Sequence, residues 1–205
     1  MHPSPASLIH RITDAVHPLD APSLFPAVQP LEVELGSGDG SFILDYAARH
    51  PEHNFLAVER LLGRLRKIDR KGTRLGLANL RGLRIEAGYF LEHLLPANST
   101  LALHLYFPDP WPKRRHWKNR LVNERFPALA RRVLIPGGPL HLRTDNPDYF
   151  EQMTLVFREA PSFERVETPP ELLALKTDFE QDFNARGIPT LHATYLSRGE
   201  PPTHQ

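Results

Sequence analysis

Short apolar runs alternate with longer amphipathic segments along the chain from Gln29 onward. Parallel strands need long crossover connections, usually helices, so this alternation predicts an α/β fold with a mostly parallel sheet and helices on both faces. Strands are expected at residues 31–35, 55–58, 83–85, 101–107 and 140–143, with an antiparallel closing strand at 190–197. Helices are expected at residues 41–50, 61–71 and 149–159, and another is expected to follow a cap at Asn123.

Two stretches lack this regular pattern. Six of the 21 prolines lie within the first 30 residues, which predicts an irregular Pro-rich arm over residues 1–28. Residues 168–189 are only partly patterned, which is typical of a functional or mobile loop. Because 205 residues suit one hydrophobic core, residues 29–205 are expected to form a single domain.

The absence of cysteine excludes disulfide scaffolds, cysteine-based zinc sites, iron–sulfur clusters and thiol catalysis. The eleven histidines lack the paired spacing of zinc ligands, so no metal site is expected. Neither a P-loop nor a Gly-x-Ser-x-Gly nucleophile elbow occurs. No apolar run approaches the ~18 residues of a membrane span, and the N-terminal residues lack a signal-peptide core, so we expect a cytoplasmic protein.

Positive charge is concentrated in two segments, although the formal net charge is only +1. Nine basic residues and one acid lie between Arg60 and Arg84, and five more basic residues lie between Lys113 and Arg120. A helix that continued through Gly72 would align five of them in one stripe, namely Arg60, Arg64, Lys67, Lys71 and Arg74. A phosphate backbone would relieve the repulsion within this stripe, but a solvated surface is an equally good explanation.

A glycine-rich turn lies between the first predicted strand and the first predicted helix, with glycine at positions 36, 38 and 40. Such a turn allows the backbone to approach a ligand closely, beside the unpaired N–H groups that begin a helix. Glu59 follows about 20 residues later, where a carboxylate can accept hydrogen bonds from both ribose hydroxyls. The two features predict a nucleotide-type cofactor. A plain connecting turn and an acidic helix start are the alternatives.

A carboxylate stands at or just after the C-terminal end of five predicted strands, where ligands of open α/β sheets bind. Such an acidic edge disfavours phosphate and favours a cationic sulfonium cofactor together with an N–H-rich nucleobase. Glu86 alone is explained equally well as a helix cap. The five acids are Glu34, Glu59, Glu86, Asp109 and Asp145.

The most specific segment runs from Tyr106 to Arg120. Prolines on both sides of Asp109 restrict the backbone, so the carboxylate is expected on a rigid turn suited to a positioned catalytic group. The basic run that follows is interleaved with Trp111 and Trp117, and it can contact phosphates and stack on an unpaired base.

These motifs resemble those of the bacterial tRNA (guanine-N7)-methyltransferases, over about residues 31–197. The segment from Phe107 to His116 resembles the family's signature, and the glycine turn, Glu59, Thr144-Asp145 and residues 177–180 support it. The resemblance implies a class I, Rossmann-like methyltransferase fold. It also implies S-adenosylmethionine as the cofactor, the N7 of guanine 46 in the tRNA variable loop as the methyl acceptor, and a monomer or homodimer.

The resemblance also implies roles for individual residues. Asp109 would be catalytic, and the cofactor site would comprise Glu34, Gly36, Gly38, Gly40, Glu59, Glu86 and Asp109. The target guanosine would be held by Lys113, Asp145, Thr177, Asp178, Phe179 and Glu180. The basic segments add possible tRNA phosphate contacts at Arg64, Lys67, Lys71, Arg114, Arg115 and Lys118. The chain departs from the family at Glu86, where Asp is usual, and in its Pro-rich arm, which replaces an often basic tail.

Guanine N7 carries a free lone pair, so it can attack a sulfonium methyl group without first losing a proton. The site must therefore supply alignment and negative potential rather than a strong base. Two rival functions share part of the pattern. A nicotinamide-dependent dehydrogenase also uses a glycine turn and a distant acid, although Ser41 occupies its third glycine position. A non-catalytic RNA-binding module would need only the basic segments.

Overall fold

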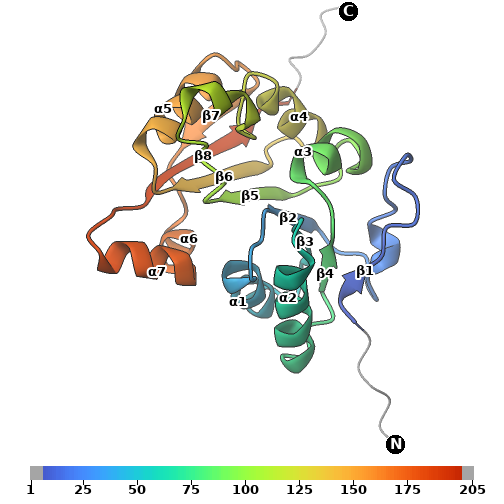
Figure 1. The fold of residues 1–205 in the computed structure, drawn as a ribbon. Coiled ribbons are helices and arrows are strands. Elements are labelled where there is room, and N and C mark those ends of the chain that lie inside the picture. The colour runs from blue at the N-terminus through green and yellow to red at the C-terminus, as the bar shows by residue number, and fades with distance from the viewer. Residues whose placement is uncertain (1–6, 200–205) are drawn as a thin grey trace, which may run out of the picture. The chain divides into compact units, whose positions relative to one another are not determined.

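The computed structural model describes residues 7–199. The chain divides into two compact units, Met1–Pro96 and Ala97–Gln205, which are described in turn and can be followed by colour in Figure 1. A single domain over residues 29–205 stays a prediction.

The first unit is built on parallel strands in the order β1-β4-β3-β2. Every residue of β2 and β3 is buried, as expected of parallel strands covered on both faces. The strands are β1 (Ile9–His10), β2 (Leu31–Leu35), β3 (Asn54–Val58) and β4 (Leu80–Leu83). The helical elements are η1 (Pro22–Leu24), α1 (Ser41–Arg49), α2 (Leu62–Arg74), α3 (Ala87–Tyr89) and the π-helical turn η2 (Phe90–Leu94).

The second unit contains β5 to β8 in the order β5-β6-β8-β7. β5 pairs with β6 in parallel, whereas β8 pairs antiparallel with both β6 and β7, which confirms the antiparallel closing strand. The strands are β5 (Ala102–Tyr106), β6 (Pro139–Thr144), β7 (Phe163–Val166) and β8 (Leu191–Ser197). The helices are η3 (Arg114–Asn119), α4 (Phe126–Val133), α5 (Pro147–Arg158), α6 (Pro170–Ala174) and α7 (Asp178–Ala185).

Two local predictions were wrong. The strand expected at residues 83–85 lies at Leu80–Leu83. It includes Gly82, which is unusual in a strand, because the Leu65 side chain packs where a Gly82 side chain would lie. A Cβ at Gly82 would lie 2.8 Å from the Leu65 Cδ1 atom. The loop expected at residues 168–189 contains α6 and α7. The Pro-rich arm expected at residues 1–28 is described from residue 7, where it contains β1, which pairs with β4, and η1. Its irregular character as a whole stays a prediction.

Two helix details also differ from the sequence pattern. Leu65 and Ile68 of α2 are buried as expected, but Leu61 precedes the helix as its N-cap and is 47% exposed. Asn123 caps a turn before α4, where its side chain accepts a hydrogen bond from the Arg125 N–H at 3.0 Å. No helix within residues 7–199 combines the length and the apolar character needed to cross a membrane.

Two buried histidines of the second unit have structural partners. The rings of His104 and His141 stack with their centroids 5.1 Å apart, and the His141 Nδ1 atom lies 3.0 Å from the Thr194 Oγ1 atom. Burial lowers the pKa of His141 well below its usual value, and the nearby His104 and Arg143 add to this shift. Across residues 7–199, no group of three or more His, Asp or Glu side chains is placed to hold a metal ion.

Candidate functional site

The glycine turn of the first unit has the backbone that its sequence predicts. Gly36, Gly38 and Gly40 have φ angles of +78°, +56° and +85°, in the left-handed region that favours glycine. The Gly36 N–H donates to the Val58 carbonyl at 2.8 Å and so ties the turn to the end of β3. At Gly40 space is also limiting, because a Cβ would lie 2.7 Å from the Ile68 Cγ1 atom.

Glu59 organises this turn. Its side chain is buried, with the residue 6% exposed, and its Oε2 atom accepts a hydrogen bond from the Gly38 N–H at 3.0 Å. Its Oε1 atom accepts from the Leu61 N–H at 2.7 Å, at the start of α2. Glu59 is therefore both a helix-start residue and a brace for the glycine turn. Glu34 is equally buried at 3% exposure, on β2 opposite Ala57.

Glu86 caps a helix. Its two carboxylate oxygens accept hydrogen bonds from the Gly88 N–H at 2.8 Å and the Tyr89 N–H at 2.7 Å, at the first turn of α3. The structure thus contains the cap that the sequence allowed as an alternative. Its role as a cofactor residue stays a prediction.

Four of the five stripe residues lie on α2, which continues without interruption through Gly72, whereas Arg60 precedes the N-cap Leu61. Gly72 is buried, and a Cβ there would lie 2.5 Å from the Leu8 Cδ1 atom, so this glycine serves close packing. Arg64 and Lys67 are exposed, and the Lys71 Nζ atom lies 4.0 Å from the Asp39 Oδ2 atom. The stripe is therefore a positively charged face beside the glycine turn of the same unit.

In the second unit, Asp109 is exposed on a strained turn that follows β5. Phe107 and Trp111, on either side of it, have φ angles of +51° and +44°, which are uncommon for residues with large side chains. Such strain costs about 1–3 kcal/mol per residue and clusters at functional sites. The Asp109 carboxylate is thus presented between two strained residues, and its rigid placement stays a prediction.

The basic run after this turn is largely exposed. Lys113, Arg114, Arg115 and Lys118 are exposed, and the Arg114 guanidinium lies 5.6 Å from the centre of the Trp117 ring. This surface combines positive charge with an aromatic ring, the combination that binds single-stranded nucleic acid.

Asp145 follows β6 at the start of α5. The next residue, Asn146, caps that helix by accepting a hydrogen bond from the Tyr149 N–H at 2.8 Å. The Thr144 Oγ1 atom in turn accepts from the Asn146 N–H at 3.1 Å. These bonds fix the backbone on both sides of Asp145, whose side chain is half-buried.

Residues 177–180 form the first turn of α7 and divide into buried and exposed members. Thr177 is the N-cap, and its Oγ1 atom accepts a hydrogen bond from the Glu180 N–H at 2.9 Å. Asp178 and Phe179 are exposed, and the Phe179 ring packs edge-on against Phe107 with the ring centroids 5.2 Å apart. Glu180, by contrast, is only 1% exposed.

The partner of Glu180 is Arg143, a residue that sequence reasoning missed. The buried Arg143 Nη1 atom lies 3.0 Å from the Glu180 Oε2 atom and 2.8 Å from the Leu175 carbonyl oxygen. Arg143 also donates to the Leu172 carbonyl and lies over the Tyr106 ring. A charged residue inside an apolar strand was the available signal, because such a group needs partners when it is buried.

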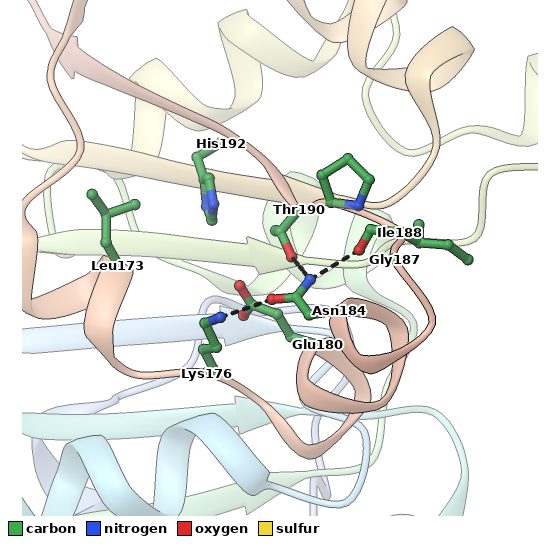
Figure 2. Close-up of a pocket in the computed structure, with 9 residues that line it drawn as sticks. Leu173, Lys176, Glu180, Asn184, Gly187, Ile188, Thr190 and His192 are labelled. Atoms are coloured by element: carbon green, nitrogen blue, oxygen red, sulfur yellow. Dashed lines mark hydrogen bonds between the residues drawn. The ribbon is translucent and has the colours of Figure 1, made fainter.

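A pocket of about 350 Å³ lies against α7 and the start of β8 (Figure 2). Asn184 donates to the Ile188 carbonyl and to the Thr190 hydroxyl, and it accepts from the Lys176 ammonium group at 2.8 Å. Burial lowers the pKa of His192 in the wall below its usual value, so its imidazole is neutral at pH 7. Glu180 of α7, one of the residues expected to hold guanosine, lines this pocket.

This chain is similar to a known protein family and to several named proteins. The model of a family described as "Putative methyltransferase" matches residues 28–192. A tRNA (guanine-N(7)-)-methyltransferase of Chromohalobacter salexigens is 40% identical over 149 residues, which are 73% of this chain and 60% of that protein. A protein of the same name from Alkalilimnicola ehrlichii is 34% identical over 181 residues, which are 88% and 76% of the two chains.

The chain spans about three fifths of the length of several of these relatives. Among solved structures, the 16S rRNA methyltransferase KamB matches with a TM-score of 0.57 and 20% identity, covering 83% of this chain and 89% of that one. This likeness shows the fold, which is that of the class I methyltransferases. Given the family model and the similarity to the two enzymes, this chain belongs to the tRNA (guanine-N7)-methyltransferase family.

Proposed function

We propose that this protein transfers a methyl group from S-adenosylmethionine to the N7 atom of guanine 46 in the variable loop of tRNA. The observation that carries the proposal is the strained turn between Phe107 and Trp111, which presents Asp109 in a chain of this family. The exposed basic residues that follow the turn, beside the half-buried Trp117 ring, support an RNA substrate.

The glycine turn fits the cofactor. A Cβ built on Gly36 or Gly38 would meet nothing within 4 Å, so the backbone is open to close approach by a ligand. Glu59 would accept hydrogen bonds from the ribose hydroxyls with the lone pairs left over from the Gly38 and Leu61 amides. When bound, S-adenosylmethionine supplies an electrophilic methyl group. Glu34 and Glu86 remain proposed members of this site.

The residues of the second unit would recognise the guanine. Asp109 and Asp145 carry acceptors only, so they suit the N1–H and amino groups that distinguish guanine from adenine. Their negative charge would stabilise the base as it becomes cationic during methylation. The exposed Phe179 offers a stacking surface, and Lys113 would contact the nucleotide. Thr177 and Glu180 would act by shaping α7.

The direct test incubates the purified protein with S-adenosylmethionine and unmodified tRNA and then maps the methylated nucleoside by mass spectrometry. We expect 7-methylguanosine at position 46, and no product on a tRNA that carries adenine there. Methylation of another atom would overturn the proposed reaction, and methylation of another guanine would overturn the position. Tight tRNA binding without methylation would favour the RNA-binding module.

Replacing Glu59 with Ala should weaken S-adenosylmethionine binding about 10- to 100-fold, because a charged acceptor for two hydroxyls and the brace of Gly38 are both lost. Calorimetric titration measures the affinity. Asp45→Ala, which removes an exposed carboxylate of α1, is the matched control and should leave the affinity unchanged. Wild-type affinity in a folded Glu59→Ala protein would confine Glu59 to starting α2.

Replacing Arg64, Lys67 and Lys71 together with Gln should lower the slope of log affinity for tRNA against log salt by up to ~3, if all three contact phosphates. Filter-binding titrations at several salt concentrations give the slope. The control variant replaces the exposed residues Arg158, Arg165 and Arg198, which changes the net charge equally. Equal slopes for the two variants would show that the stripe is a solvated surface.

A further inference from the structure

Arg120 is a fully enclosed cation at the end of the basic run. It is 2% exposed, and its guanidinium carbon lies 4.5 Å from the centre of the Trp117 ring and 4.7 Å from that of Tyr149. Its Nε atom donates to the Pro110 carbonyl at 2.7 Å, and its Nη1 atom donates to the Gln152 Oε1 atom at 2.6 Å. Its enclosure removes it from the surface that could contact RNA phosphates.

The bond to Pro110 reaches a turn whose main chain makes few other hydrogen bonds. Phe107 is held by its N–H, which donates to the Arg143 carbonyl at 2.8 Å. Within residues 7–199, the bond from Arg120 is the only hydrogen bond to the main chain of residues 108–112. Left-handed residues with large side chains persist only where their surroundings over-determine them. The Phe107 N–H therefore anchors the start of the turn, and Arg120 anchors it three residues later, at the Pro110 carbonyl.

The other contacts of Arg120 lead to the second proposed guanine-binding carboxylate. Tyr149 and Gln152 lie on α5, which begins directly after Asp145 and Asn146. Gln152 also donates to the Val122 carbonyl at 2.9 Å, and the Tyr149 hydroxyl accepts from the Val122 N–H at 3.0 Å. One guanidinium therefore joins the turn of Asp109 to the helix that starts beside Asp145.

We propose that Arg120 is a positioning residue for methyl transfer, which fixes the Asp109 turn relative to Asp145 through the Pro110 carbonyl and α5. This inference rests on the proposed function. A planar fork with several fixed N–H groups suits the task, because it holds two acceptors in one geometry while its faces pack between rings.

Replacing Arg120 with Met should lower kcat about 10- to 100-fold at saturating S-adenosylmethionine and tRNA, because small displacements of a positioned group can cost two orders of magnitude. The KM for tRNA should change less than threefold, since exposed cations provide the phosphate contacts. The matched control is Arg81→Met, which removes another arginine that donates to backbone carbonyls, at 3.0 and 2.7 Å, and packs on the Phe25 ring. The control should keep the wild-type kcat.

Two Gln152 variants keep the inference testable if the Arg120 variant does not fold. Gln152→Leu should lower kcat, because Arg120 loses one acceptor. Gln152→Glu keeps the acceptor for Arg120 but loses the donor to the Val122 carbonyl. A higher kcat in Gln152→Glu than in Gln152→Leu would therefore show that the loss in the Leu variant comes from the bond to Arg120. Equal losses in both variants would overturn the inference.

Tryptophan fluorescence gives a readout that does not need enzymatic activity. The chain has two tryptophans, Trp111 and Trp117, and in a Trp117→Phe background Trp111 reports on the turn alone. Its emission maximum and acrylamide quenching should change with Arg120→Met and not with Arg81→Met. Unchanged fluorescence together with an unchanged kcat would overturn the inference, as would a lower melting temperature with wild-type kcat. If the wild type does not methylate tRNA, the proposed function fails, and Trp111 still decides whether Arg120 holds the turn.

Discussion

Replacing Asp109 with Asn should lower the single-turnover rate of methyl transfer about 10²- to 10³-fold, the scale for removing one electrostatic stabiliser from an active site. The variant keeps the shape of the side chain and removes its charge, which would otherwise stabilise the base as the methyl group arrives. The measurement is the rate with S-adenosylmethionine and tRNA both saturating. Saturation separates the chemical step from the modest loss of cofactor affinity that a carboxylate near the donor would cause.

A control for net charge is available on the same unit. Glu159 is exposed at the far end of α5, and Glu159→Gln removes one negative charge without touching the proposed site. This variant should react at the wild-type rate. An Asp109→Asn rate within threefold of the wild type would contradict a catalytic role and leave Asp109 as part of a structural turn.

Replacing Arg143 with Met should lower the free energy of unfolding by about 3–5 kcal/mol, because the Glu180 carboxylate would remain buried without its cation. The Leu172 and Leu175 carbonyls would lose their donor as well. Chemical denaturation measures the loss. The double variant Arg143→Met, Glu180→Leu should recover part of the stability, since neither charge is then buried.

An exposed ion pair on α7 provides the comparison. Arg186 pairs with Asp182, and both side chains are more than half exposed. Arg186→Met should change stability little, because solvent screens exposed pairs and long side chains lose entropy when they pair. Equal small losses from Arg186→Met and Arg143→Met would show that the buried pair contributes no more than a surface pair.

The hydrophobic pattern predicted β2 and β3 well because their signal is local. Leucine and valine alternate with Glu32 and Glu34 in β2, and four apolar residues follow Asn54 in β3, so both segments stand out in the sequence. The helix after the glycine turn was expected within one residue of its observed end. The prediction placed β4 three residues too late because Gly82 is a poor strand former, and its place in the strand depends on packing against Leu65. That contact joins residues distant in sequence, so no local pattern reveals it.

The candidate site was predicted in part. Carboxylates at strand ends pointed to Glu59 and Asp109, and the structure shows that the Glu59 side chain braces the glycine turn and that Asp109 lies between two left-handed residues. Thr177 and Glu180 have the spacing of a capping box, a signal of α7 that was present in the sequence. The pairing of Glu180 with Arg143 could not be read from the sequence, since their contact depends on how α7 packs on β6.

The turn between Phe107 and Trp111 has a consequence for the cooperativity of the fold. Three of residues 108–112 are proline, so only Asp109 and Trp111 carry amide hydrogens, and no strand ladder links this segment to the sheet. A segment secured mainly by side chains can open locally while the sheet stays folded. The free energy needed to open this segment is therefore separate from the free energy needed to unfold the sheet. A ligand that binds the closed segment can raise the first without raising the second equally.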